Sequence, residues 1–210
     1  MSSIPGTPGA PNGLGGARSR RADFPVAVQF LDRWSPRAFT EEPMTQADLM
    51  GVLEAARWAP SSSNVQPWRF AYSLRGDEHW AGYVSVLNEN NQRWARRAAA
   101  LVVLLSSRFV VAPNGEASVS RTHAFDTGCA WGFLALQAHL SGWAAHAMAG
   151  FEAERARALI GVPMSYTIEA VVALGRQGTV DVLPMGLQPR ELPSQRRPLV
   201  DSVFAGKFTG

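Results

Sequence analysis

The order of hydrophobic and polar positions between residues 45 and 74 predicts a helix, a polar loop and a strand in succession. Apolar side chains recur at helical spacing over residues 46–58, and Thr45 followed by Asp48 is typical of a capping box at a helix start. Pro60 ends that helix, because a proline ring cannot continue it. Aromatic and apolar residues then alternate with polar ones over 68–74, which indicates a half-buried strand. The intervening loop is therefore held between two packed elements.

Helical spacing recurs before and after this region. Asp23 is expected to cap a first helix in which Val26 and Phe30 face inward. Residues 77–100 keep helical spacing throughout, so one helix is expected there, with Asn91 near its end.

The second half of the chain predicts a core strand and its covering elements. The unbroken apolar run at 101–105 indicates a central strand covered on both faces, and the polar segment 108–122 is expected to form a rim or lid. Residues 126–141 are apolar nearly all round a helix, so the core or another subunit must cover every side. A helix over 152–160 and a strand over 167–174 complete the predicted domain, and a proline-rich arm follows.

Composition predicts one domain. With 210 residues, 46% of them hydrophobic, the chain can build one sizeable core, which we expect over residues 22–210. Residues 1–21 are rich in proline and glycine and are expected to be a disordered tail.

Charge, hydropathy and cysteine content argue against several classes of protein. The 20 basic and 17 acidic residues leave a net charge of +3 without a basic stripe, so no nucleic-acid partner is expected. No apolar run approaches the roughly 18 residues that span a bilayer, and no signal peptide pattern is present, so no membrane association is expected. Cys129 is the only cysteine, which excludes an internal disulfide and fits a cytoplasmic location.

Two polar segments could bind a ligand, although each has an ordinary structural explanation. Arg33, Ser35 and Arg37 place two guanidinium groups and a hydroxyl within five residues, which suits either a phosphate or a solvated surface. The hydroxyl and amide groups of residues 61–64 could bind a ligand or stabilise their own turn. Asn91 alone would be read as a helix-terminus residue.

Other chemistries find little support in the sequence. His123, His139 and His146 lack metal-ligand spacing, so no metal is expected, and we interpret them as structural or rim residues. The chain has no nucleophile elbow, phosphate-binding P-loop or dinucleotide fingerprint.

The segments Arg33-Trp34-Ser35-Pro36-Arg37-Ala38-Phe39 and Ala56-Arg57-Trp58-Ala59-Pro60-Ser61-Ser62-Ser63-Asn64-Val65-Gln66-Pro67-Trp68 together resemble the signature of the nitroreductase family of flavin-dependent oxidoreductases. Weaker similarity continues from about residue 24 to the C-terminus. The resemblance implies an α+β fold, a three-layer α/β/α sandwich with a mainly antiparallel central sheet and a C-terminal arm exchanged in a dimer. It also implies an FMN cofactor that takes a hydride from NADH or NADPH and passes electrons, by a ping-pong mechanism, to a nitroaromatic or quinone type of acceptor.

The resemblance implies a set of cofactor-binding residues and no certain catalytic side chain, because the flavin carries the chemistry. They are Arg33, Trp34, Ser35, Arg37, Pro60, Ser61, Ser62, Asn64, Gln66, Asn91, Trp94, Met148, Ala149, Gly150, Arg196 and Arg197. Arg33, Ser35 and Arg196 are expected to hold the phosphate and ribityl chain. Arg37 is expected near the pyrimidine side, where charge develops on reduction, and Asn91 at the ring edge.

The turn after residue 147 carries a further part of the resemblance. Ala149 and Gly150 are expected to approach the reactive N5 of the flavin through their backbone. Two positions depart from the family pattern, since Trp94 stands where some members have a lysine and Ala147 replaces a proline. The first departure bears on the reduced flavin or on the choice of acceptor.

The family shares its flavin sites across a homodimer, so the loop from Pro60 to Asn64 is expected to complete the site of a second chain. A protein that only binds or stores flavin would keep Arg33, Ser35 and Arg196, and remains an alternative. A flavin-dependent dehydrogenase, dehalogenase or flavin-fragmenting enzyme on the same fold is another.

Overall fold

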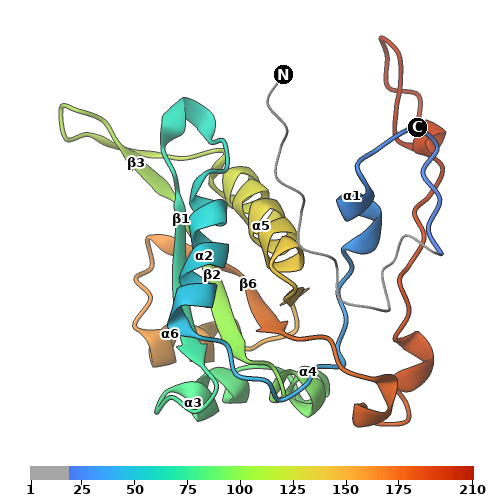
Figure 1. Cartoon of the computed structure of the whole chain (residues 1–210). Coiled ribbons are helices and arrows are strands. Elements are labelled where there is room, and N and C mark those ends of the chain that lie inside the picture. The colour runs from blue at the N-terminus through green and yellow to red at the C-terminus, as the bar shows by residue number, and fades with distance from the viewer. Residues whose placement is uncertain (1–18) are drawn as a thin grey trace, which may run out of the picture.

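A computed structural model describes residues 19–210 as a four-stranded antiparallel sheet between two layers of helices (Figure 1). The strand order in the sheet is β1-β2-β6-β5, so β1 and β5 form its edges. The helices are α1 (Val28–Asp32), α2 (Gln46–Arg57), α3 (Trp80–Ser85), α4 (Glu89–Ala95), α5 (His123–Leu140) and α6 (Ala153–Ile160). The strands are β1 (Trp68–Leu74), β2 (Ala100–Ser107), β3 (Phe109–Val111), β4 (Ala117–Val119), β5 (Ala144–Met148) and β6 (Tyr166–Gly175). Short 3₁₀ helices span Ser62–Asn64, Val180–Val182, Gln188–Arg190 and Leu199–Asp201.

Strand β2 shows why the domain has three layers. Its apolar side chains alternate between the two faces, as the period of a strand requires. Leu101, Val103 and Leu105 pack in one core with residues of α3, α4 and α6. Val102 and Leu104 pack in the other core with residues of α2 and α5. This confirms the predicted three-layer α+β class and the prediction of a central strand covered on both faces, while the exchange of the C-terminal arm stays a prediction.

The predicted helix and strand around the polar loop are confirmed. The side chain of Thr45 accepts the backbone N–H of Asp48, and the Asp48 carboxylate accepts the backbone N–H of Thr45. Helix α2 ends at Arg57, and Pro60 prevents its continuation. Strand β1 has the predicted bounds and pairs along its whole length with β2. Gly161 ends α6 in the left-handed conformation that glycine adopts without strain.

The prediction of one helix over 77–100 is wrong. The chain forms α3 and α4 instead, with a break at residues 86–88, where Leu87 makes an isolated β-bridge to Phe151. The Asn88 side chain accepts the backbone N–H of Asn91 at 2.9 Å and so starts α4. Asn91 therefore lies in the first turn of a helix, not near the end of one.

The predicted first helix is also corrected. Helix α1 has only five residues and begins at Val28, and the carboxylate of Asp23 accepts the backbone N–H of Leu199 at 2.7 Å instead of capping it. Val26 and Phe30 are exposed, because a helix this short packs few side chains on the domain. The predicted tail, residues 1–21, lies mostly outside the described residues; within its described part, Arg20 donates hydrogen bonds to the domain.

Two further segments differ in detail from expectation. Helix α5 begins at His123, three residues before its predicted start. The polar segment after β2 forms a hairpin of β3 and β4, with the turn at Pro113-Asn114-Gly115. Among the described residues, no helix is long and apolar enough to cross a membrane.

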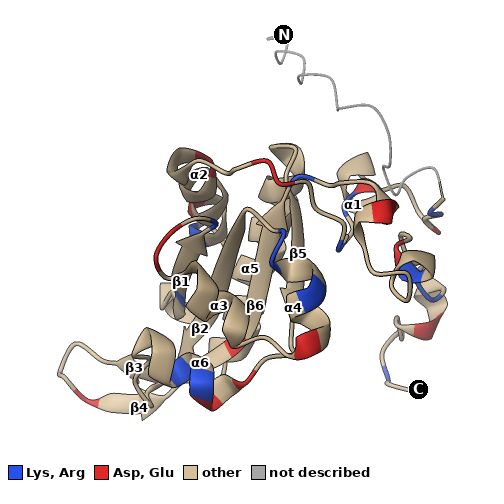
Figure 2. Cartoon of the chain, turned by 90° about the horizontal axis from the view of Figure 1, so that it is seen from below, with Lys and Arg blue, Asp and Glu red and all other residues tan. Residues whose placement is uncertain are grey.

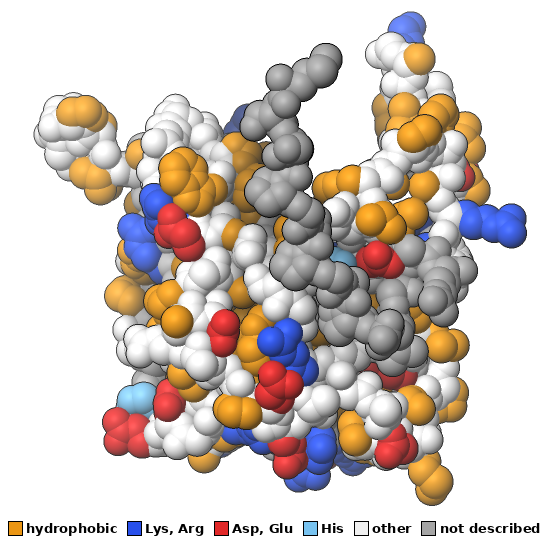
Figure 3. Space-filling model, in the orientation of Figure 1, with side chains coloured by type: hydrophobic (Ala, Val, Ile, Leu, Met, Phe, Trp, Pro, Cys, Tyr) orange, Lys and Arg blue, Asp and Glu red, His pale blue; other side chains and the backbone are white. Residues whose placement is uncertain are grey.

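The C-terminal arm, residues 176–210, runs beside α1 on one side of the molecule and exposes apolar side chains (Figures 1 and 3). Leu192, Val200 and Phe208 are each more than 70% exposed. On α5, Phe125 and Phe133 are exposed as well. The single chain therefore leaves uncovered the surfaces that the sequence predicts for contact with a second copy.

Candidate active site

The loop between α2 and β1 has a backbone conformation that is unusual for its residue types. Ser63, Asn64 and Gln66 have φ angles of 49°, 54° and 52°, and among residues 19–210 no other residue except glycine has a positive φ. Strained backbone of this kind costs of order 1–3 kcal/mol per residue and concentrates at functional sites. The hydroxyl of Ser61 accepts the backbone N–H of Gln66 at 3.0 Å and helps to hold the strained turn. These angles favour the ligand-binding interpretation over an ordinary turn.

The loop projects its polar groups outward. Pro60, Ser62 and Asn64 are exposed, and the backbone N–H of Ser62 donates to the carboxylate of Asp126, in the first turn of α5, at 3.3 Å. The loop is thus fixed to the start of α5 while its hydroxyl and amide groups face away from the core.

The segment from Arg33 to Arg37 follows α1 and forms a second polar region. The Arg33 guanidinium lies 3.5 Å from the Ser35 hydroxyl, at the limit of a hydrogen bond. Burial, and then the nearby charge of Arg196, lower the pKa of Arg33. The indole Nε1 of Trp34 is buried and has no hydrogen-bond partner among the described residues. An unpaired buried donor of this kind is unfavourable and suits a site that receives an acceptor.

Arg37 is held by a glutamate that the sequence did not indicate. Glu191 is only 8% exposed, and its carboxylate accepts the backbone N–H groups of Arg37 at 2.5 Å and Ala38 at 2.8 Å. The Arg37 guanidinium lies 3.6 Å from the same carboxylate. Glu191 therefore fixes the position of Arg37 and offsets part of its charge. A lone glutamate in a proline-rich arm carries no sequence signal for this contact.

The turn after β5 is bound to the start of α4. The carbonyl oxygen of Gly150 accepts the side-chain amide of Asn91 and the backbone N–H of Asn88, both at 3.0 Å. A β-carbon at Gly150 would lie 2.3 Å from Nδ2 of Asn88 and 2.8 Å from Nδ2 of Asn91, so any other residue would force both asparagine side chains to move. The neighbouring Ala149 is exposed.

Not every predicted site residue reaches the surface. Trp94 is 2% exposed, and its ring packs against His146 with a centroid distance of 4.7 Å and against Phe39 at 6.1 Å. This placement disagrees with the prediction that Trp94 contacts a ligand, because its ring is buried in the core. Met148 is buried as well, which leaves only its backbone available.

His146 links these parts of the site. Its Nδ1 donates to the carbonyl oxygen of Pro36 at 3.0 Å, with the tautomer set by that acceptor. Its ring contact with Trp94 then connects β5 to α4. Arg37, Asn91 and Gly150 consequently lie on one side of the sheet, near the edge strand β5. Arg197 follows Arg196 on the exposed arm and forms no side-chain hydrogen bond or ion pair within residues 19–210.

The loop of residues 60–66 lies at the opposite edge of the sheet from this group. It leads into β1, whereas Gly150 follows β5, and β2 and β6 lie between the two edges. Three strand spacings separate them by about 14 Å. Figure 1 likewise places α1 and α2 on different sides of α5. One chain therefore does not bring the two halves of the predicted site together.

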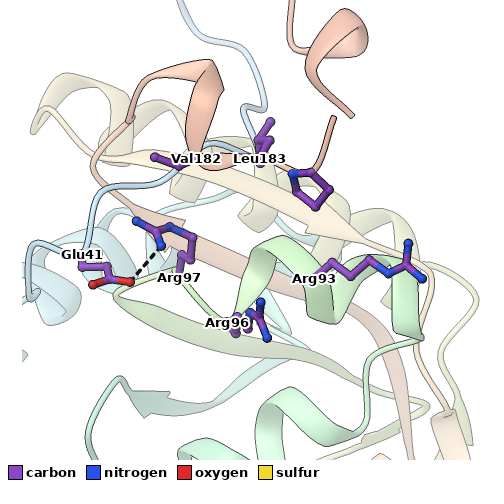
Figure 4. Close-up of a pocket in the computed structure, with 7 residues that line it drawn as sticks. Glu41, Arg93, Arg96, Arg97, Val182 and Leu183 are labelled. Atoms are coloured by element: carbon purple, nitrogen blue, oxygen red, sulfur yellow. Dashed lines mark ion pairs between the residues drawn. The ribbon is translucent and has the colours of Figure 1, made fainter. Parts of the chain in front are cut away.

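A separate basic cavity of about 460 Å³ lies between the end of α4 and the C-terminal arm (Figure 4). In it, the Arg97 guanidinium points toward Glu41 and forms an ion pair of 3.0 Å. Arg93 and Arg96 line the same cavity, together with Val182, Leu183 and Pro184. None of the predicted cofactor-binding residues lines it. This cavity therefore lies apart from the candidate site.

Among residues 19–210, the remaining titratable groups form no metal centre. The hydroxyl of Ser106 lies 2.7 Å from Nδ1 of His123 and donates to Glu169 at 2.5 Å, which gives His123 a structural contact. Within the described residues, no group of three histidine, cysteine or acidic side chains could hold a metal ion. The basic residues are spread over several elements and form no continuous stripe in the view of Figure 2.

A three-layer sheet protein with an arginine cluster and a packed glycine turn at one edge, and a strained polar loop at the other, belongs to the class of nitroreductase folds. The sequence profile of the Nitroreductase family matches residues 31–81. A crystal structure described as an oxidoreductase containing FMN is 46% identical, with a TM-score of 0.89, over 91% of this chain and 96% of that chain. The chain belongs to the nitroreductase family, which confirms the resemblance found in the sequence.

Two curated relatives show how far the similarity extends. The NADH dehydrogenase of Thermus thermophilus is 28% identical over 170 residues, which cover 69% of this chain and 83% of that protein. A Streptomyces coelicolor protein, provisionally named an NADH dehydrogenase/NAD(P)H nitroreductase, is 35% identical over 78 residues. That alignment spans 37% of this chain and only 38% of the Streptomyces protein.

Proposed function

We propose that this protein is an FMN-dependent oxidoreductase that uses NADH or NADPH to reduce a small acceptor of the nitroaromatic or quinone type. One observation carries the proposal: the Arg33 guanidinium lies 3.5 Å from the Ser35 hydroxyl with the charge of Arg196 nearby, and neither arginine forms an ion pair with a carboxylate among residues 19–210. A phosphate carries about two negative charges and accepts several charge-assisted hydrogen bonds, so it suits this cluster. The similar oxidoreductase structure that contains FMN supports the same ligand.

Other parts of the site fit the rest of such a cofactor. The indole N–H of Trp34, which has no partner among the described residues, offers a donor. The exposed Ala149 next to Gly150 offers backbone groups at the surface. Asn91 is held at Gly150 by its hydrogen bond, so its position is fixed before any ligand arrives. A preformed site of this kind loses little conformational entropy on binding.

Bound FMN would supply the redox chemistry, accepting a hydride from NAD(P)H and returning electrons to the acceptor in the same place. The residues of this chain bind and orient it. Arg37 contributes positive charge beside the site, where Glu191 fixes its direction. Electrostatic groups that are fixed in advance stabilise charge as it develops and need no reorganisation.

The proposed enzyme is a homodimer. The two sheet edges lie about 14 Å apart, so the two halves of a site come from different chains. Each of two shared sites is built from residues 60–66 of one chain and from Arg33, Arg37 and Gly150 of the other. The exposed apolar side chains of the arm and of α5 supply a surface for the second copy. Obligate interfaces of this type usually bury more than about 2,000 Å².

The decisive experiment is anaerobic reduction of the purified yellow protein. We expect NADH or NADPH to bleach the flavin absorbance, and a panel of nitroaromatic and quinone oxidants to restore it. Initial rates with both substrates varied should give the parallel double-reciprocal lines of a ping-pong mechanism. Yellow protein that neither nucleotide bleaches would point to the flavin-binding or storage alternative, and protein that binds no FMN would refute the proposal.

A further inference from the structure

Arg20 occupies a position at which three parts of the chain meet. Its Nε donates to the carbonyl oxygen of Ser194 at 2.9 Å. Its Nη1 donates to the carbonyl oxygens of Leu31 at 3.0 Å and Arg33 at 2.8 Å. These three bonds use both hydrogens of Nη1 and the single hydrogen of Nε, so Nη2 keeps two donors without a partner among residues 19–210.

Arg20 lies against both arginines of the candidate phosphate site. It binds the main chain of Arg33 directly, and Arg196 donates to the same Ser194 carbonyl oxygen that Arg20 uses, at 3.4 Å. Burial, followed by the charges of Arg196 and Arg33, lowers the pKa of Arg20. Within the described part of the chain, none of the three guanidinium groups forms an ion pair. Three neighbouring positive charges repel one another, and an anion would relieve that repulsion.

We propose that Arg20 is the third guanidinium of the phosphate site, where its free Nη2 donors bind the FMN phosphate alongside Arg33 and Arg196. This inference rests on the proposed FMN-dependent function. Arg20 precedes the motif that identifies the family, and its partners lie 11, 13 and 174 residues away. Nothing in the local sequence therefore indicates that it belongs to the site.

A purely structural role for Arg20 is the main alternative, since its hydrogen bonds also join the N-terminal segment to the arm. Two other contacts already make that connection. The side-chain amide of Gln195 donates to the carbonyl oxygen of Ser19, and the backbone N–H of Leu199 donates to Asp23. The attachment of the two segments therefore does not depend on Arg20 alone.

The test compares FMN with riboflavin, which has the same ring and ribityl chain but no phosphate. Dissociation constants are measured with the flavin-free full-length protein by quenching of flavin fluorescence. Arg20→Ala should weaken FMN binding about 10- to 100-fold, the loss expected for a charge-assisted hydrogen-bonded contact, and should leave riboflavin binding unchanged. Arg21→Ala is the matched control, because Arg21 is the exposed neighbour with no side-chain hydrogen bond or ion pair within residues 19–210. It should bind both flavins like the parent.

The measurement with riboflavin distinguishes the loss of a phosphate contact from a defect in folding. Equal loss of FMN and riboflavin binding in Arg20→Ala would show a structural role and overturn the inference, as would unchanged FMN binding. Arg20→Lys, which keeps the charge, should retain more of the preference for FMN than Arg20→Ala does. Failure of the parent itself to bind FMN would instead refute the proposed function, so the two failures are distinguishable.

Discussion

The side-chain amide of Asn91 donates a hydrogen bond of 3.0 Å to the carbonyl oxygen of Gly150, which lies 59 residues further along the chain. The backbone N–H of Asn88 donates to the same oxygen, also at 3.0 Å. The start of α4 and the turn after β5 therefore form one rigid unit at the edge of the sheet. This unit positions two of the residues for which the family resemblance implies flavin binding.

Substitution of Gly150 should break this unit. The β-carbon of alanine would lie 2.3 Å from Nδ2 of Asn88, so Asn88 and Asn91 must move. We expect Gly150→Ala to lower the free energy of unfolding by about 1–3 kcal/mol and to weaken FMN binding. The control is Gly51→Ala, in the middle of α2, where nothing lies within 4 Å of the added carbon. That variant should be more stable than the parent by about 0.5–1 kcal/mol. Urea titration measures both, and equal stability of the two variants would contradict the argument.

Arg37→Ala should retain FMN and slow its reduction. The positive charge of Arg37 matters most as electrons arrive, and loss of such a group typically lowers a rate about 10²–10³-fold. Because Glu191 already offsets part of that charge, we expect about 10-fold or more in the anaerobic reduction rate. Arg96→Ala, on the exposed turn after α4, is the control and should reduce at the parental rate. Equal rates for Arg37→Ala and the parent would exclude the electrostatic role.

Glu191→Ala should destabilise the protein strongly. The variant leaves the backbone N–H groups of Arg37 and Ala38 without their acceptor and the Arg37 charge without its partner. Removal of one member of a buried ion pair typically costs about 3–5 kcal/mol. Glu42→Ala provides the comparison, because the exposed Glu42–Arg176 pair, at 3.2 Å, should contribute less than about 1 kcal/mol. The free energy of unfolding is measured by chemical denaturation at neutral pH. Equal losses in Glu191→Ala and Glu42→Ala would show that the contacts of Glu191 do not stabilise the fold as argued.

Stability should fall as the pH drops below about 6.5, the ordinary pKa of histidine. Burial, with the nearby charge of Arg37 acting in the same direction, lowers the pKa of His146 in the folded protein. Between the lowered value and the ordinary one, the unfolded chain binds more protons than the folded chain, so acidification favours unfolding. Burial also lowers the pKa of His139.

The measurement is the free energy of unfolding at pH 7.5 and pH 5.5. His146→Asn should lose less stability between these two values than the parent does. His79→Asn, at an exposed position, should show the same loss as the parent. If His146→Asn lost as much stability between pH 7.5 and pH 5.5 as the parent does, the pH dependence would come from other groups.

Mixed dimers test whether two chains share each site. Arg33→Ala and Asn64→Ala should each bind FMN poorly alone. If the sites are shared, one site of the mixed dimer carries both changes and the other carries neither. Random exchange of equal amounts should then restore about a quarter of the parental sites, because half of the dimers are mixed and each has one intact site.

The control mixes Arg33→Ala with Ser35→Ala and tests whether recovery requires changes in opposite halves of the site. Both residues belong to the same half of the proposed site, so every site in the mixture keeps one change and no activity should return. Recovery in neither mixture, despite proven exchange, would show that each chain builds its own site.

Local sequence determined the elements whose stabilising contacts lie within a few residues. The capping box of Thr45 and Asp48 and the stop at Pro60 fixed the bounds of α2, and the apolar run at 101–105 identified β2. The two motifs also identified the family, because their residue types and spacing are distinctive. These features need no knowledge of distant neighbours.

Only the tertiary structure decided features that depend on residues far apart in the sequence. The break between α3 and α4 needs the bridge from Leu87 to Phe151, and the helical spacing of residues 77–100 contains no sign of it. The core position of Trp94, in α4, likewise depends on its ring contact with His146 of strand β5.

The contacts that complete the candidate site belong to the same category. Glu191 reaches Arg37 across 154 residues, and Arg20 reaches Ser194 across 174. Each of these side chains has an unremarkable local sequence, because its role comes from the partner that folding brings to it. Short-range patterns record helix caps and strand periods, whereas contacts between distant segments arise only when the layers of the fold have packed.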